Sequence, residues 1–217
     1  MLASAIRPPT PQALADAADA IGRGGLVVMP TDTVYGVAAD PFNPSATERL
    51  FEVKRRPADL VLPVLVADAA QARRLAGAWP EDAEALASAF WPGPLTVIVP
   101  AAAPPALHLG GAGGTVGLRQ PAHPAALALL RLTGPLAVSS ANVSGAPPAV
   151  TAADAARQLG DGVALYLDAG RAGGQTVSSV VDLSAGPMRL TRAGGIGQAE
   201  LETALGRARG ALTGGGA

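Results

Sequence analysis

The chain has 217 residues, 49% of them hydrophobic, and its 16 basic and 17 acidic side chains leave a net charge of -1. This length and hydrophobic content suffice for one sizeable core, whereas two full domains would be cramped. A nearly neutral chain with 3% aromatic residues is poorly suited to tight non-specific binding of nucleic acid or to stacking single-stranded bases.

The rare residue types exclude several kinds of chemistry. There is no cysteine, which rules out disulfides, thiolate zinc sites, iron–sulfur clusters and cysteine nucleophiles. With two histidines, His108 and His123, a histidine-based metal site has little support. The first ten residues do not resemble a signal peptide, and no apolar run is long enough to span a membrane. We therefore expect a cytoplasmic protein that makes no contact with a membrane.

Helix and strand signals intermingle along the whole chain. The first half predicts a helix, a strand, a helix, a strand, two helices and a strand, at Pro11–Ile21, Leu26–Met29, Pro44–Lys54, Leu62–Val66, Ala69–Ala76, Glu81–Phe90 and Leu95–Val99. The second half predicts strands at Val116–Arg119, Leu136–Ser139, Ala164–Asp168, Ser179–Leu183 and Met188–Thr191, and helices at Ala125–Leu132, Ala152–Leu159 and Gln198–Arg207. This mixture predicts one mixed α/β domain over residues 1–217, with a core from about 10 to 205. The Gly-rich segment from Gly206 to Ala217 is expected to be an unstructured tail.

A hydroxyl-rich segment, Pro30–Gly36, directly follows the first predicted strand. Thr31 and Thr33 would therefore stand at a strand end, where ligand sites of α/β proteins usually form, and could hydrogen-bond a small polar ligand. The alternative is a tight turn in which Asp32 and Thr33 satisfy backbone groups.

The densest positive charge in the chain is Lys54-Arg55-Arg56-Pro57, at the end of a predicted helix. Lys54 is the only lysine, and its compact ammonium differs from the planar fork of arginine. Because the helix breaks at Pro57, Lys54 and Arg56 could turn towards one cleft and hold phosphate. The alternative is a solvated group of cations that complements the helix dipole.

A third polar segment, Ser139–Gly145, follows the strand predicted at Leu136–Ser139. Its small side chains are expected to leave backbone N–H groups exposed, which suits a phosphate or a ribose. The alternative is an ordinary Asn/Ser/Gly turn. The chain carries no Walker loop and no G-x-S-x-G nucleophile motif, and His123 is expected to begin a helix.

Six segments in order resemble the YrdC family, the threonylcarbamoyl-AMP synthases. They span residues from about 12 to 200 and are Pro30–Gly36, Lys54–Pro57, Trp91–Thr96, Val116–Arg119, Ser140–Gly145 and Ser178–Asp182. The resemblance implies a twisted, open mixed sheet flanked by helices around a basic cleft, in a YrdC/RibB-like fold. Because the chain has no room for the additional C-terminal domain of longer members, it looks like the short, single-domain form.

The resemblance also implies an activity and its partners: synthesis of L-threonylcarbamoyl-AMP from L-threonine, bicarbonate or CO₂, and ATP, with release of pyrophosphate and Mg²⁺ riding on the phosphates. The product would pass to a separate transferase that modifies tRNA, and a weak contact with RNA is left open. By position, the resemblance implies catalytic residues Lys54, Arg56, Ser140 and Asn142, which also bind ATP together with Thr115 and Arg192. The residues implied to bind L-threonine are Thr31, Arg119 and Ser178, and no dedicated metal ligands are expected.

The chain departs from the family pattern at three positions. Val177 stands where a proline is frequent, Ser179 replaces a threonine, and Pro148 occupies a position where some members have a nucleotide-side serine. These changes bear on the fine geometry of ligand binding.

Three other functions remain alternatives. One is an RNA-binding module with a basic cleft and no catalysis, which the low net charge disfavours. Another is a carbamoyl-transfer maturation factor, which would need cysteine-rich zinc segments that are absent here. The third is a regulatory domain that binds a nucleotide without chemistry.

Overall fold

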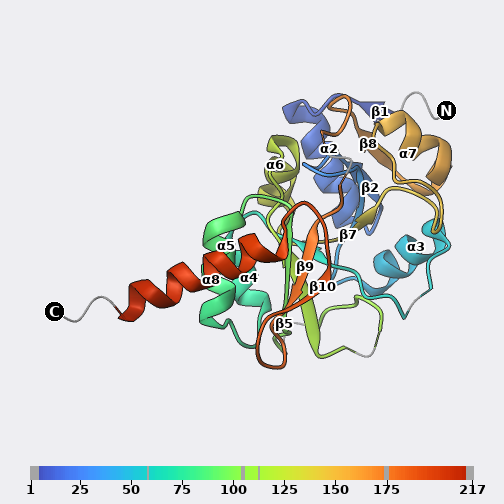
Figure 1. Cartoon of the computed structure of the whole chain (residues 1–217). Coiled ribbons are helices and arrows are strands. Elements are labelled where there is room, and N and C mark those ends of the chain that lie inside the picture. Colours follow the sequence, from blue (N-terminus) through green and yellow to red (C-terminus); the bar gives the residue numbers. More distant parts are fainter. Residues whose placement is uncertain (1–4, 58, 104–105, 112, 174–175, 214–217) are drawn as a thin grey trace.

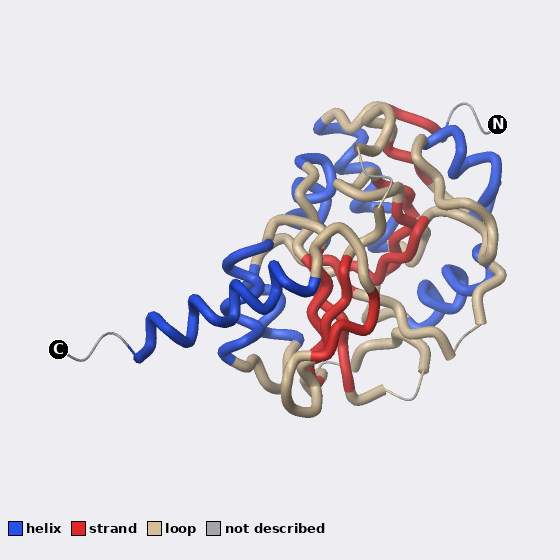
Figure 2. Tube along the Cα trace, in the orientation of Figure 1, coloured by secondary structure: helices blue, strands red, loops and turns tan. Residues whose placement is uncertain are grey.

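The computed structural model describes residues 5–57, 59–103, 106–111, 113–173 and 176–213. Within them, one ten-stranded mixed sheet runs in the order β1-β8-β2-β3-β7-β4-β6-β5-β9-β10, with helices around it (Figures 1 and 2). The predicted mixed α/β fold is therefore confirmed. No helix in these ranges is both long and apolar enough to cross a bilayer.

The helices are α2 (Pro11–Gly22), α3 (Pro44–Lys54), α4 (Ala69–Leu75), α5 (Glu81–Phe90), α6 (Pro124–Thr133), α7 (Ala152–Leu159) and α8 (Gln198–Thr213), with a short 3-10 helix η1 (Gly160–Gly162). The strands are β1 (Ile6–Arg7), β2 (Val27–Met29), β3 (Gly36–Ala39), β4 (Val64–Leu65), β5 (Leu95–Pro100), β6 (Thr115–Arg119), β7 (Leu136–Ser140), β8 (Leu165–Leu167), β9 (Ser179–Asp182) and β10 (Arg189–Arg192). Side-chain caps start several helices, as when Thr10, Asn43, Asp68 and Thr151 accept hydrogen bonds from the first-turn backbone.

The helices and strands predicted from the sequence are present. The structure differs by two additional strands and by a longer last helix. Strands β1 and β3 were not predicted, because a two-residue edge strand and the run Gly-Val-Ala-Ala lack a strand pattern. The predicted tail from Gly206 is wrong as far as Thr213, since α8 continues through it and projects from the body in Figure 1. Alanine, leucine and arginine around Gly206 favour helix and let α8 propagate. Residues 214–217 lie outside the described ranges.

The sheet buries apolar side chains on both faces, so neighbours along a strand belong to different cores. One core joins α2 and α6, which pack together, to Val27, Met29, Leu65, Leu136 and Val138. The other joins helices α3, α4, α5, α7 and α8 to Val28, Val37, Val64, Val97 and Leu118. Side chains alternate between these cores along β2, β4 and β7, as the pleat of a strand requires.

The strand register puts the sequence-predicted polar residues on one face. Leu65, from the core under α6, pairs with Arg119 of β6, and Gly117 pairs with Ile98 of β5. On the other side of Leu65, Leu136 of β7 pairs with it, so Val138 and Ser140 follow on the same face. Residues Leu65, Arg119, Gly117, Ile98, Val138 and Ser140 all line one cavity.

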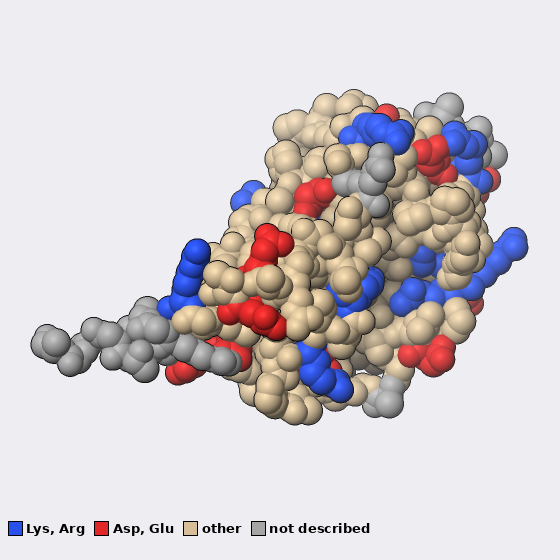
Figure 3. Space-filling view, in the orientation of Figure 1, with Lys and Arg blue, Asp and Glu red and all other residues tan. Residues whose placement is uncertain are grey.

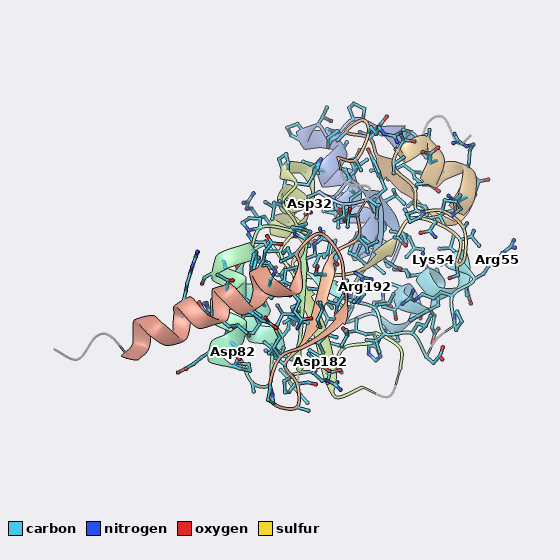
Figure 4. All side chains as sticks on the ribbon, viewed as in Figure 1. Asp32, Lys54, Arg55, Asp82, Asp182 and Arg192 are labelled. Atoms are coloured by element: carbon cyan, nitrogen blue, oxygen red, sulfur yellow. The ribbon has the colours of Figure 1, made fainter. Side chains whose placement is uncertain are left out.

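Helix α3 ends in a Schellman motif that aims its terminal cations in different directions. Arg56 N–H donates to Phe51 O and Arg55 N–H to Glu52 O, both at 2.9 Å. Arg55 takes the left-handed conformation, with φ of 48°, a conformation that glycine usually adopts. Arg55 therefore extends from the surface, while Lys54 stays inside, as Figure 4 shows.

Replacing Arg55 by glycine should stabilise the protein. Arg55→Gly removes the steric cost of a left-handed residue, which predicts a gain of about 1 kcal/mol in the free energy of unfolding. Urea unfolding measures it. Glu48→Gly, at an exposed interior position of the same helix, is the matched control and should lose about 0.5–1 kcal/mol. Equal losses in both variants would contradict the prediction.

Candidate functional site

A cavity of about 390 Å³ opens on the sheet face defined by the register. Its walls come from the 31–36 segment, strands β4 to β7, β9 and β10, and the chain after α3. The lining includes Thr31, Arg56, Thr115, Arg119, Ser140, Ser178 and Arg192 among the predicted site residues, together with Thr96, Gly117, Val138, Pro148 and Val177. Lys54 and Asn142 do not line it, but both contact the turn that carries Ser140.

Lys54 is buried, with 1% of its surface exposed, and its ammonium donates hydrogen bonds to backbone carbonyls of that turn. Nζ donates to Ser140 O at 2.5 Å and to Asn142 O at 2.6 Å, while Lys54 O accepts from Ser144 N–H at 2.8 Å. Burial, and secondarily the charge of Arg56, lower the pKa of Lys54 to about 8. The last residue of α3 is thus joined to the turn after β7 by three hydrogen bonds.

Most backbone N–H groups of the turn from Ser140 to Pro147 are used within the protein, contrary to the expectation from the sequence. Those of residues 141, 142, 143, 144 and 146 donate to Tyr35 O, Ser140 O, Gln158 Oε1, Lys54 O and Val143 O. At these five positions the interpretation of the turn is wrong, because Lys54 and Gln158 reach it from two helices that the local sequence does not reveal. Ligand groups must be met at these five positions by side chains.

Asn142 is the side chain of this turn with an unused atom. Its Nδ2 donates to Val143 O at 2.9 Å and to Ala146 O at 2.8 Å, which fixes the amide. Its Oδ1 is buried and, within the described part of the chain, has no hydrogen-bond partner. Since buried acceptors are nearly always satisfied, this oxygen marks a place where a bound donor or cation would lie.

Arg119 is the most buried of the cavity arginines, with 7% exposed, and two segments fix its guanidinium. Nε donates to Gly93 O at 3.0 Å, one terminal nitrogen to Thr33 Oγ1 at 3.3 Å and the other to Asp32 Oδ1 at 2.7 Å. Asp32 also accepts from Ala122 N–H at 3.0 Å. With five N–H groups, the guanidinium keeps donors for a planar anion such as a carboxylate.

Thr31 and Thr33 form one hydroxyl pair beside Arg119. Their oxygens are 3.0 Å apart, and Thr31 Oγ1 also donates to Val34 O at 2.6 Å. The segment is thus a satisfied turn, as the second alternative predicted. Thr31 and Thr33 also line the cavity, and their contact with a ligand stays a prediction.

Ser178 and Arg192 meet where β9 and β10 line the cavity. Arg192 Nε donates to Ser178 O at 2.9 Å, and a terminal nitrogen donates to Ser178 Oγ at 2.8 Å. The neighbouring Ser179 is fully buried and accepts from Gly194 N–H and Ile196 N–H, each at 3.0 Å. A Cβ on Gly194 would lie 2.4 Å from this backbone, so the loop after β10 packs directly on Ser178.

Arg56 lies on the α3 side of the cavity with Leu60 and Val61. Its Nε donates weakly to Leu60 O at 3.3 Å and a terminal nitrogen to Val61 O at 3.4 Å. Burial lowers its pKa, although an arginine remains charged at neutral pH. Since both bonds are long, the guanidinium can be recruited by an anionic ligand at little cost.

The charge of the cavity has one sign. Its described lining includes Arg56, Arg119 and Arg192 and no aspartate, glutamate or histidine. In Figure 3 several basic side chains lie near the middle of the face, while other basic and acidic side chains are scattered around it. The cavity is therefore suited to a small anionic molecule, a feature that the low overall charge of the chain does not reveal.

Three residues of the site region were missed by the sequence-based predictions. Asp32 holds Arg119, Gln158 holds the Ser140 turn from α7, and Thr96 lines the cavity and bonds Ser178. Asp32 and Thr96 lie inside two of the six quoted segments, which was an available signal. Gln158 has no such signal, because it is an ordinary polar residue of a helix.

A basic, hydroxyl-lined cavity on the open face of a mixed sheet has the features of a site for small anionic ligands. The sequence matches the family described as "Telomere recombination", Sua5_yciO_yrdC, over residues 19–194. The chain therefore belongs to the Sua5/YciO/YrdC family.

Named relatives agree with this assignment. A Mycobacterium tuberculosis protein called "Putative threonylcarbamoyl-AMP synthase" is 47% identical over 193 residues, covering 89% of each chain. The crystal structure of Pyrococcus abyssi Sua5 complexed with L-threonine is 39% identical and superposes with a TM-score of 0.85 over 89% of this chain and 57% of that one. Escherichia coli YciO, 24% identical, shares the fold with a TM-score of 0.79 over 90% of this chain and 96% of that one.

Gln158 does not line the cavity, but its substitution should weaken nucleotide binding. Gln158→Leu removes the bonds to Val143 N–H and Pro147 O, both 3.1 Å, and should lower ATP affinity about tenfold by loosening the Ser140 turn. Calorimetric titration with ATP measures the effect. Arg157→Ala, an exposed neighbour on α7, should bind ATP like the wild type.

ATP affinity should also depend on the charge of Lys54. Because the pKa of Lys54 in the fold is about 8, its positive charge is present below that pH and lost above it. ATP affinity should therefore fall, by roughly tenfold, as the pH rises through about 8. Lys54→Met lacks the charge at every pH and should show no such step. A step that persists in Lys54→Met would assign it to another group.

Proposed function

We propose that the protein is an L-threonylcarbamoyladenylate synthase, a nucleotidyltransferase. It would convert L-threonine, bicarbonate or CO₂, and ATP into L-threonylcarbamoyl-AMP and pyrophosphate. The observation that carries this proposal is the single-signed cavity, in which three arginines from three parts of the chain face one space of about 390 Å³. The names of the relatives support the same activity.

The amino acid would bind at the end of the cavity that holds Arg119. Arg119 is held in place by Asp32, Thr33 and Gly93, so its remaining donors are oriented before a ligand arrives. A carboxylate that accepts two of these donors would form a bidentate pair. Thr31 and Ser178 line the same cavity. The Ser178 hydroxyl would meet a remaining polar atom of L-threonine, and the Thr31 hydroxyl would do so by exchanging one of its bonds within the turn.

ATP would occupy the part of the cavity between Arg56, Thr115 and Arg192, with the Ser140 turn beside its phosphates. Arg56 is a cation with only long hydrogen bonds, so it can move onto a phosphate oxygen. The Ser140 hydroxyl lines the cavity, and Asn142 Oδ1 can accept a hydrogen bond, since it has no partner among the described residues. Lys54 would act chiefly by holding this turn and by adding positive charge beneath it.

Mg²⁺ would accompany the nucleotide. Among the described residues, no three histidine, aspartate or glutamate side chains lie together in a way that could hold a metal ion. The oxygen donors near the cavity are hydroxyls and the unpartnered Asn142 Oδ1, which suit an ion that keeps several waters and rides on phosphates. When bound there, Mg²⁺ would supply additional positive charge to the phosphates.

The reaction joins two anions, the carbamate of L-threonine and the triphosphate of ATP. The threonine amine adds to CO₂ and loses a proton to give a carbamate, whose oxygen forms a bond to the α-phosphorus while the bond to the pyrophosphate oxygen breaks. Arginines on both sides of the cavity would offset the repulsion and align the attack. The product is expected to pass to the tRNA threonylcarbamoyl transferase machinery in the cytoplasm.

An RNA-binding module is the second candidate, and its basic cleft would be the same cavity. A cavity sized for a small ligand and a net charge of -1 favour the enzyme. Binding of RNA without any product from the three substrates would favour the module.

Two substitutions of Lys54 test whether product formation needs only a positive charge at this position or also the compact shape of the ammonium. Lys54→Ala should lose most product formation and about 1–3 kcal/mol of stability, because two buried carbonyls lose their donor. Lys54→Arg should also lose most turnover, since a planar guanidinium does not fit the space of the buried ammonium. Mass spectrometry of L-threonylcarbamoyl-AMP measures the yield. Near wild-type product from either variant would reject this role, and Arg55→Gly is the control that should keep activity.

A further inference from the structure

Two buried hydroxyls on the cavity wall bond to each other, and one of their two hydrogens has no acceptor among the described residues. Thr96 Oγ1 and Ser178 Oγ are 3.0 Å apart, and each residue is 5% exposed. Both residues line the cavity, Thr96 from β5 and Ser178 from the segment just before β9. Within the described part of the chain, the only other partner of either hydroxyl is Arg192, which donates to Ser178 Oγ at 2.8 Å.

The count of hydrogens follows from these bonds. Two hydroxyls carry two hydrogens, and one of them forms the bond between Thr96 and Ser178. The bond from Arg192 uses only a lone pair of Ser178. Whichever residue donates within the pair, one O–H is left over, and the protein offers it no acceptor among the described residues. A nearly buried donor of this kind calls for an acceptor from a ligand.

The position of the pair indicates which ligand would supply the acceptor. Strand β5 lies between β6, which carries Arg119, and β9, which Ser178 precedes. Arg192 bonds Ser178 on one side, and its charge is close enough to Arg119 to lower the pKa of Arg119, after the larger effect of burial. An anionic oxygen placed between two guanidinium groups would meet the spare hydroxyl hydrogen there.

We propose that Thr96 is a further binding residue for the amino-acid substrate, acting with Ser178 as a unit that donates one hydrogen bond to its carboxylate. This inference rests on the proposed function, because it takes Arg119 as the carboxylate partner. Thr96 would also position Ser178, since the bond between them holds the two hydroxyl oxygens 3.0 Å apart. Its methyl group, 3.3 Å from where a Cβ of Gly117 would lie, helps to shape the floor of the cavity.

The test compares variants that differ by one group. Thr96→Val keeps the shape and removes the hydroxyl, and it should bind L-threonine about tenfold more weakly, with a matching rise in KM for L-threonine. Its ATP affinity should stay within about twofold of wild type, because a merely structural defect would lower both. Thr96→Ser keeps the donor and should bind L-threonine within about threefold of wild type.

The control is another buried threonine whose hydroxyl is remote from the cavity. Thr47 in α3 is 2% exposed and donates to Pro44 O at 2.9 Å, so Thr47→Val removes a buried hydroxyl without touching the site. It should bind L-threonine like the wild type.

A double substitution tests whether the hydroxyls act as a unit. If they do, Thr96→Val combined with Ser178→Ala should bind L-threonine no more weakly than Ser178→Ala alone. Wild-type affinity in Thr96→Val, equal losses in Thr96→Val and Thr47→Val, or fully additive losses in the double variant would overturn the inference. Failure of the wild type itself to bind L-threonine or form product would instead overturn the proposed function.

Discussion

The contact between the Lys54 ammonium and the carbonyls of Ser140 and Asn142 is the constraint on which the site depends. It joins the end of helix α3 to the turn after β7, two segments 86 residues apart in sequence. A buried ammonium without acceptors would be costly, and two free carbonyls would be costly too, so each satisfies the other. The fold thereby keeps one cation under a turn that faces a cavity of positive charge.

The rest of the cavity repeats this arrangement of cations held before a ligand is present. Arg119 is fixed by a carboxylate, a hydroxyl and a carbonyl, and Arg192 is fixed by a single serine. Arg56 is the exception, because its bonds are long and its partners are two carbonyls of a surface segment. The site therefore combines rigid donors with one adaptable donor, which suits a reaction in which charge moves between ligands.

Much of this arrangement was predictable from the sequence, for physical reasons that differ between elements. The helices were predictable from their capping residues and apolar periodicity, as at the N-caps Thr10 and Asn43. The polar segments at 30–36, 54–57 and 139–145 were recognisable because each interrupts an apolar pattern. Their convergence was not predictable, since it depends on the strand order β3-β7-β4-β6-β5-β9, which no local pattern encodes. For the same reason the partners of the turn, Lys54 for its carbonyls and Gln158 from α7, appeared only in three dimensions.

Two places on the floor of the cavity are bare backbone, because Gly36 and Gly117 stand where neighbouring strands carry side chains. A Cβ at Gly36 would lie 2.6 Å from Val138, and one at Gly117 would crowd Thr96 and Ile98. At these two positions the cavity is already as deep as the sheet permits, so no exchange of Gly36 or Gly117 can deepen it. A change in the size of molecule accepted must therefore come from side chains around them, such as Val138 and Val180. Redesign for bulkier amino acids would widen this chamber without lowering its base.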